Sequence, residues 1–124
     1  MAAQTTTYRT YPSVPVRVLS TERGQEVYLE GRMDVRCAPD VRLALHSVIA
    51  SGSGDLFVHL GDVEIGDATG LGVLVECHRR AVREGRRLVV ASITPRTERL
   101  LRASRLHRVL HVARPSRDVV AVTA

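Results

Sequence analysis

Apolar and polar positions follow two different periods along this chain, and the change of period separates predicted strands from predicted helices. Apolar residues occupy alternate positions in 16–18 and 27–29, which predicts two strands joined as a hairpin, with Gly24 suited to the turn. From Pro39 to Ile49 the apolar residues recur at helical spacing, and proline fits the first turn of a helix. The sequence 51–54, rich in serine and glycine, predicts the end of that helix.

The second half of the sequence again alternates between strand and helix patterns. Short apolar runs at Leu56–Leu60 and 88–91 predict strands that are buried on both faces. Between them a helix is predicted from about Thr69 to Glu84, with its core-facing side formed by Leu71, Leu74, Val75, His78 and Val82. Thr94 followed by a proline predicts the start of a third helix, which continues to about Ser104 and buries Leu100 and Leu101.

This order of elements predicts one α/β domain with a mixed sheet of four to five strands packed with three to four α-helices. The domain is expected over residues 15–114, after a flexible segment 1–14 and before a C-terminal tail or extra element at 115–124. Within 113–124, Val119, Val120 and Val122 either add a strand or belong to an irregular C-terminal tail.

Composition narrows the possible location and ligands of the chain. Its 124 residues suffice for one buried core, while one Phe, three Tyr and no Trp leave no aromatic platform for stacking bases or sugars. No apolar run approaches the roughly 20 residues that a membrane helix needs, and the N-terminus lacks the pattern of a signal peptide. Cys37 and Cys77 are interpreted as reduced thiols. We therefore expect a cytoplasmic protein without a membrane partner.

Positive charge is concentrated in the second half of the sequence. Residues 1–78 contain six arginines and ten acidic residues, whereas residues 79–124 contain twelve arginines and three acidic residues. This asymmetry has two interpretations: solvated helix faces, or a surface for nucleic acid or anionic membrane. The second interpretation would use Arg79, Arg80, Arg83, Arg86 and Arg87.

The turn before the second predicted helix, Asp67–Gly72, combines a carboxylate, a hydroxyl and two glycines. The first N–H groups of a helix have no partner within the helix, and the helix dipole favours negative charge there. A phosphate on Thr69 would therefore be tolerated, and it would place further negative charge beside Asp67. The alternative is that Asp67 or Thr69 only caps the helix.

Four segments of the sequence together resemble a known protein family. They are 29–34 with the following Ala-Pro, the turn Asp67–Gly72, 85–90, and 104–110. From about Val16 to Val112 the sequence resembles the STAS domain family and, within it, the bacterial anti-sigma factor antagonists. In that family the hydroxyl residue before the first glycine of the turn is phosphorylated, a position that corresponds to Thr69. The resemblance departs at three positions: Ala68 replaces a serine, Gly66 replaces a bulky apolar residue, and Arg105 replaces a glycine.

The resemblance implies a cycle of binding and phosphorylation. The dephosphorylated protein would bind an anti-sigma factor that is a serine/threonine kinase of the histidine-kinase-like ATPase fold, and so free a sigma factor for transcription. The kinase would phosphorylate Thr69 and release the protein, and a PP2C-type phosphatase would restore it. Val73, Cys77 and Arg80 are predicted to face away from the core as a docking surface. The expected partner-contacting residues are Asp34, Asp67, Ala68, Thr69, Gly70, Leu71, Gly72, Val73, Cys77 and Arg80.

Other constellations point to no further chemistry. His107 and His111 are spaced to share one helix face, but no third ligand accompanies them, and His78 is expected to be a buried, hydrogen-bonded residue. No nucleophile, base and orienting group can be assembled, so we expect no enzyme, no cofactor, no metal and no nucleic acid partner. Two alternatives stay open: a STAS scaffold subunit of a larger assembly with Thr69 as an unmodified helix cap, and the basic nucleic-acid or membrane-surface binder.

Overall fold

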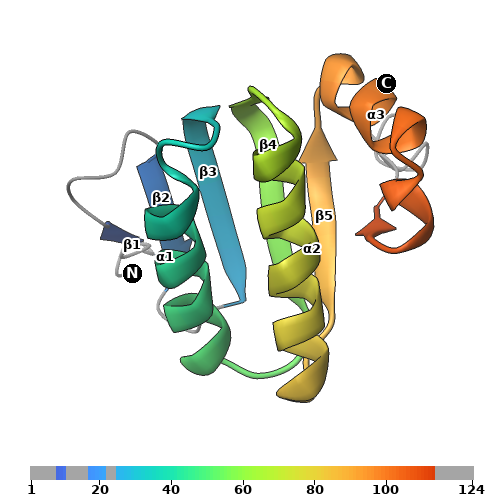
Figure 1. The fold of residues 1–124 in the computed structure, drawn as a ribbon. Helices are drawn as coiled ribbons and strands as arrows, with labels where there is room; N and C mark the ends of the chain where they lie inside the picture. The colour runs from blue at the N-terminus through green and yellow to red at the C-terminus, as the bar shows by residue number, and fades with distance from the viewer. Residues whose placement is uncertain (1–7, 11–16, 22–24, 114–124) are drawn as a thin grey trace, which may run out of the picture.

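A mixed β-sheet, with its strands in chain order, is the centre of the computed structural model, which describes residues 8–10, 17–21 and 25–113 (Figure 1). In this part of the chain the sheet consists of β1 (Tyr8–Thr10), β2 (Arg17–Thr21), β3 (Glu26–Met33), β4 (Leu56–Ile65), β5 (Leu88–Ile93) and β6 (His111–Val112). The helices are α1 (Ala38–Ala50), α2 (Ala68–Arg83), α3 (Pro95–Ala103) and a short 3-10 helix η1 (Leu106–Arg108). The prediction of an α/β domain with a mixed sheet is confirmed.

The predicted hairpin is present as the antiparallel pair β2–β3, with Leu19 opposite Tyr28. From β3 to β6 the pairing is parallel, because a helix connects each strand to the next. The sheet has six strands rather than four to five: β1 lies within segment 1–14, where none was predicted, and β6 adds a two-residue edge. Val119, Val120 and Val122 fall outside the described residues.

Strand β4 corrects two of the predictions. It was expected to end at Leu60, but it continues to Ile65: after a register shift at the two exposed residues Gly61 and Asp62, buried Val63 and Ile65 resume the alternation. It was also expected to be covered on both faces. Instead Leu56, Val58 and Leu60 are buried, while Phe57 between them is 36% exposed. Helices α1 and α2 lie together against one face of the sheet (Figure 1).

Helix α1 buries the apolar stripe that was predicted for it, Val41, Ala44, Leu45, Val48 and Ile49. For α2, the side of the helix that is buried differs from the side that was predicted to be buried. The buried residues of α2 are Gly70, Leu71, Val73, Leu74, Cys77 and Ala81. Val75 and His78 are only half-buried and Val82 is 56% exposed, so these three were wrongly placed in the core. Helix α2 packs on both the sheet and α1, so the small residues Cys77 and Ala81 face inward, and a search for large apolar residues misses them.

Helix α3 begins as predicted, with the hydroxyl of Thr94 accepting a hydrogen bond of 3.1 Å from the Thr97 N–H. Leu101 is buried, whereas Leu100 is only partly buried. After the helix, Arg105 adopts a left-handed conformation with φ of 63°, a region that glycine occupies more easily. Arg105 therefore has a backbone conformation that is strained for a residue other than glycine. The chain reverses there, and Leu106 packs against the core.

Arg86 is buried and completes the end of α1, although it was grouped with surface arginines. Its Nη1 donates to the carbonyls of Val48 and Ile49 at 3.2 and 3.0 Å, and its Nε donates to that of Gly54 at 2.9 Å. The last carbonyls of a helix have no partner within it, and the negative end of the helix dipole favours a cation. Arg86 therefore joins α1 to the start of β5.

In the described chain, no helix is long and apolar enough to span a bilayer.

Replacing Arg86 by methionine is expected to lower the free energy of unfolding by about 2–4 kcal/mol, because buried carbonyls lose their donors. Urea unfolding followed by circular dichroism measures this loss. Arg87→Met is the matched control, because the exposed Arg87 forms a surface ion pair of 2.6 Å with Asp55, which water screens, so its loss should change stability far less. Equal losses in the two variants would contradict the capping role of Arg86.

Candidate functional site

Asp67 lies at the carboxyl end of β4 and starts helix α2. Its backbone is extended, and its Oδ1 accepts hydrogen bonds from the N–H groups of Thr69 at 3.0 Å and Gly70 at 3.2 Å. These are two of the N–H groups that a helix leaves without an internal partner. Asp67 is therefore the N-cap of α2, as one of the predicted alternatives stated.

The second oxygen of the same carboxylate joins this turn to a neighbouring one. Asp67 Oδ2 accepts a hydrogen bond of 3.1 Å from the N–H of Val35, which lies in the loop between β3 and α1. Close by, the Gly66 N–H donates to the Met33 carbonyl at 2.8 Å. Because β3 and β4 are parallel neighbours, their carboxyl ends lie at one edge of the sheet, and these bonds hold the two following loops together.

Thr69 is exposed at the second position of α2. Its N–H is bound by Asp67, but its hydroxyl forms no hydrogen bond with any residue that the structure describes. The alternative in which Thr69 caps the helix is therefore wrong. The hydroxyl is accessible, and the helix does not use it.

The two glycines of the turn have different structural roles. At Gly70 a Cβ atom would lie 3.0 Å from the Met33 carbonyl oxygen and 3.2 Å from Ile65 Cγ2, so the turn needs glycine in order to pack on its neighbours. At Gly72 a Cβ would meet nothing within 4 Å. Glycine within a helix is less stable than alanine by roughly 0.5–1 kcal/mol. Gly72 therefore weakens α2 without a packing reason inside the described fold.

A cluster of charged side chains surrounds the approach to the turn. Arg32 Nη1 lies 2.5 Å from Glu64 Oε1, and Arg32 Nε lies 3.6 Å from Asp34 Oδ2. The Arg32 guanidinium also lies within about 3 Å of the position that a Cβ of Gly66 would occupy. Arg32 therefore occupies the space beside Gly66 where a larger side chain would lie. The half-buried Asp34 also accepts a hydrogen bond of 2.9 Å from the Arg36 N–H and so shapes its own loop.

Two of the residues expected to form an exposed docking surface are inside the protein. Val73 and Cys77 are 1% and 0% exposed, so neither can contact a partner on the surface. Burial raises the pKa of the Cys77 thiol to about 12, which keeps it protonated and unreactive. Arg80, the third residue predicted for this side, is half-buried and pairs with Glu84 at 2.7 Å. The exposed positions beside Thr69 are instead Ala68 and Gly72.

The histidines also differ from their predicted places. His78 is only half-buried, its Nδ1 has no hydrogen-bond partner among the described residues, and burial lowers its pKa. Its ring centroid lies 5.7 Å from that of His111 on β6, in an edge-to-face arrangement. His107 belongs to η1, so His107 and His111 do not share a helix face. Across the described ranges, no three histidine, cysteine or acidic side chains are grouped to hold a metal ion.

The five arginines grouped as a basic footprint do not form one surface. Arg86 is buried, Arg80 pairs with Glu84, and Arg87 pairs with Asp55. Only Arg79 and Arg83 of the five are exposed without an ion pair to a described residue. The sequence did not reveal that these two line a groove of about 700 Å³ between α2 and the segment after α3.

Comparison with known proteins gives the same architecture. Residues 16–112 match a family model described as "Mlab, STAS domain". The anti-sigma-B factor antagonist of Bacillus subtilis (strain 168) is 30% identical over 104 residues, which cover 84% of this chain and 94% of that protein. An anti-sigma factor antagonist structure from Mycobacterium paratuberculosis superposes with a TM-score of 0.64 at 21% identity, covering 98% and 97% of the two chains.

The anti-sigma factor antagonist SpoIIAA also shares the fold, at 13% identity. Its structure in the unphosphorylated form has a TM-score of 0.58 and covers 94% of this chain and 96% of SpoIIAA; its phosphorylated form has a TM-score of 0.52 and covers 94% and 99%. The fold is thus that of a small α/β domain of the kind found in these proteins. This chain belongs to the STAS domain family.

Replacing Asp67 by alanine is expected to lower the free energy of unfolding by about 1–2 kcal/mol, because the cap is lost. Asp67→Ser should recover most of that loss, since serine is also a good N-cap, but its single oxygen cannot also reach Val35. Urea unfolding measures the stability, and hydrogen exchange of the Val35 N–H measures the second bond. If Val35 stays as protected in Asp67→Ser as in the original chain, the bridging role of Asp67 is wrong.

The two glycines are expected to respond to alanine in opposite directions. Gly70→Ala should destabilise the chain by about 1–2 kcal/mol through the clash with Met33 and Ile65, while Gly72→Ala should stabilise it by about 0.5–1 kcal/mol. Thermal unfolding of both variants measures the difference. Destabilisation by Gly72→Ala would show that the fold itself requires that glycine.

Proposed function

We propose that this chain is a cytoplasmic anti-sigma factor antagonist that binds an anti-sigma factor while Thr69 is unmodified and releases it when Thr69 is phosphorylated. The observation that carries the proposal is the exposed Thr69 hydroxyl, which is free because Asp67 already caps the helix. The Bacillus subtilis relative and the SpoIIAA fold support this function over the scaffold alternative.

Gly72 supports a partner at the same place. A helix glycine with empty space around it is unexplained by packing within the described chain, but it lets another backbone approach α2 closely. Ala68 and Gly72 are both exposed and lie on either side of Thr69 in the sequence. The residues around the hydroxyl therefore have small side chains or none, so a partner can cover the hydroxyl without a steric clash.

Phosphorylation would change this surface through charge. The kinase would transfer the γ-phosphoryl group of ATP to the Thr69 oxygen, with ADP leaving and the hydroxyl proton passing to a base on the kinase. The phosphate adds close to two negative charges beside the Asp67 carboxylate. Asp67 already occupies the N–H groups of Thr69 and Gly70, so the phosphate would project toward the partner and disrupt its contact.

The sequence resemblance supports two enzymes as further partners. One is the anti-sigma factor itself, as a serine/threonine kinase of the histidine-kinase-like ATPase fold. The other is a PP2C-type phosphatase, which would hydrolyse the phosphate of Thr69 and regenerate the binding form. In this cycle the chain is a substrate and a ligand rather than an enzyme, and the free, buried Cys37 and Cys77 suit the reducing cytoplasm.

Incubation with ATP and each purified anti-sigma factor kinase of the same cell is expected to add one phosphate to Thr69, located by mass spectrometry of peptides. Thr69→Ala should remain unmodified. Thr69→Glu should bind the kinase about tenfold or more weakly, because it adds negative charge where the partner contacts α2. Isothermal titration calorimetry measures the affinity.

Ser47→Ala is the matched control, since Ser47 is an exposed hydroxyl residue on α1 outside the turn, and it should change neither result. Phosphate on another residue would contradict the assignment of Thr69. Unchanged affinity of Thr69→Glu would favour the scaffold alternative instead.

A further inference from the structure

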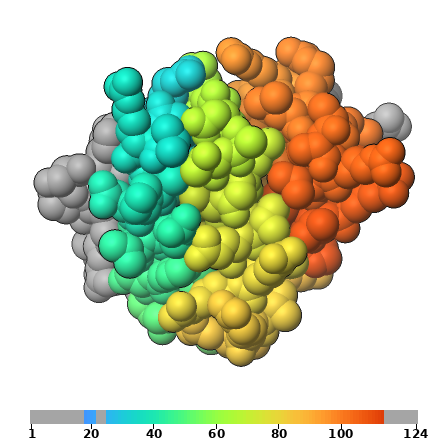
Figure 2. Space-filling model, in the orientation of Figure 1, coloured from blue at the N-terminus to red at the C-terminus, as the bar shows by residue number. Residues whose placement is uncertain are grey.

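A groove runs along α2 from the turn that contains Thr69. Its volume is about 700 Å³, and one wall is α2 from Ala68 to Arg83 while the other is formed by Ser104 and Leu106. Figure 2 shows this face, with α2 between α1 and the orange segment that contains α3 and η1. The α2 wall runs over the 16 residues from Ala68 to Arg83, whose ends are about 22 Å apart along the helix.

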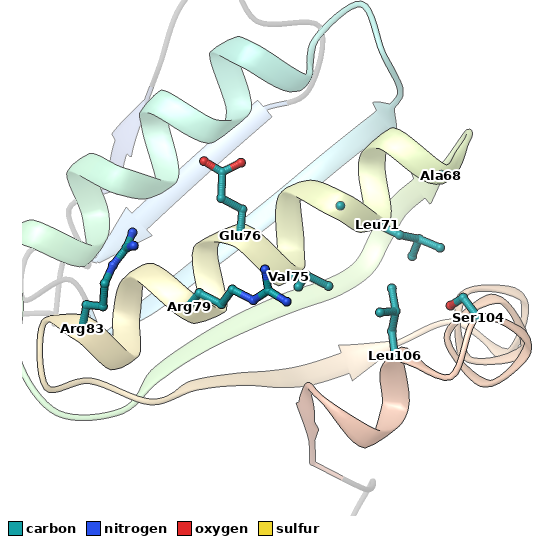
Figure 3. A pocket seen from close by; sticks show the side chains of 9 residues that line it. Ala68, Leu71, Val75, Glu76, Arg79, Arg83, Ser104 and Leu106 are labelled. Carbon is teal, nitrogen blue, oxygen red and sulfur yellow. The ribbon is translucent and has the colours of Figure 1, made fainter.

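The middle of the groove is apolar. Leu71, Val75 and Leu106 lie toward one another across it (Figure 3). Leu106 reaches this position because the left-handed conformation of Arg105 turns the chain back after α3. Apolar side chains of a bound segment would be covered here.

The charges along the groove are not balanced. Its one acidic residue, Glu76, points toward α1 (Figure 3) and is neutralised by Arg42, whose Nε lies 2.8 Å from Glu76 Oε2. Arg79 and Arg83 also line the groove, yet within the described ranges neither has an acidic partner. Arg79 extends into the space beside Val75 and Leu106 (Figure 3). The groove therefore presents an apolar floor with unpaired positive charge toward the end remote from Thr69.

We propose that this groove binds an acidic amphipathic helix of the partner protein, with apolar side chains on Leu71, Val75 and Leu106 and carboxylates on Arg79 and Arg83. This inference rests on the proposed function, because the groove starts at Ala68 and Gly72, beside Thr69. A helix of about four turns matches its length. Two of the arginines that are concentrated after residue 78 would thereby attract an acidic helix. A phosphate on Thr69 would repel the same acidic segment where the groove begins.

The first experiment uses two synthetic helical peptides of about 15 residues with the same leucine spacing, one with glutamates and one with lysines at the polar positions. Fluorescence anisotropy with the full chain should show that the acidic peptide binds about tenfold more tightly than the basic one. Raising sodium chloride from about 50 to 300 mM should weaken that binding several-fold, because salt screens exposed charges.

Charge-matched double variants locate the binding site. Arg79→Gln/Arg83→Gln should weaken acidic-peptide binding by about fivefold or more, and Val75→Glu should weaken it similarly. Arg99→Gln/Arg108→Gln removes the same charge from two exposed arginines that do not line the groove, and it should change binding by less than about twofold. Equal loss in both double variants would overturn the proposal, because it would show attraction to net charge alone.

Two other occupants would also overturn the proposal. One is a DNA duplex that binds more tightly than the acidic peptide and depends on Arg79 and Arg83. The other is a dimer of this chain in analytical ultracentrifugation that Val75→Glu disrupts.

Phosphorylation separates this inference from the proposed function. If a kinase modifies Thr69 with the same KM in the original chain and in Arg79→Gln/Arg83→Gln, the groove proposal fails while the function stands. A higher KM in that variant but not in Arg99→Gln/Arg108→Gln supports both. If no kinase modifies Thr69 but the acidic peptide still binds through Arg79 and Arg83, the function fails while the groove remains an acidic-helix site.

Discussion

The carboxylate of Asp67 is the interaction on which the site depends. One oxygen caps α2 through Thr69 and Gly70, and the other binds the loop after β3 through Val35. A single side chain thus fixes the start of a helix relative to the neighbouring strand. Because these N–H groups are already bound, the Thr69 hydroxyl has no structural task and is presented to solvent.

This arrangement separates stability from recognition within one short turn. Asp67 and Gly70 face inward and hold the loops together, whereas Ala68, Thr69 and Gly72 are exposed. A modification of the outward group can therefore alter a partner's affinity while the fold is preserved. Such a division suits the proposed cycle between a binding and a released form.

Arg86 and the pair Arg79 and Arg83 show how similar residues acquire different physical roles. Arg86 satisfies carbonyl groups at the end of α1 and is buried. Arg79 and Arg83 lie on the outer side of α2 and have no ion pair with a described residue. Over the residues that the structure describes, the arginines of the second half are therefore neither a uniform solvated surface nor a continuous footprint for a polyanion.

The sequence by itself determined the order of elements, the hairpin, the stripe of α1 and the turn around Thr69, because these follow from local periodicity and from residues suited to caps and turns. It misplaced Val73, Cys77 and Val82, since α2 packs against the sheet and α1 at once and its buried side includes small residues. Only the tertiary structure decided that Asp67 rather than Thr69 caps the helix, that Arg86 is buried, and that α2 and Leu106 form a groove. The Asp67 cap is a local contact, and local patterns suited Asp67 and Thr69 equally. The contacts of Arg86 and the groove join residues that are distant in sequence, and they depend on how the helices pack on the sheet.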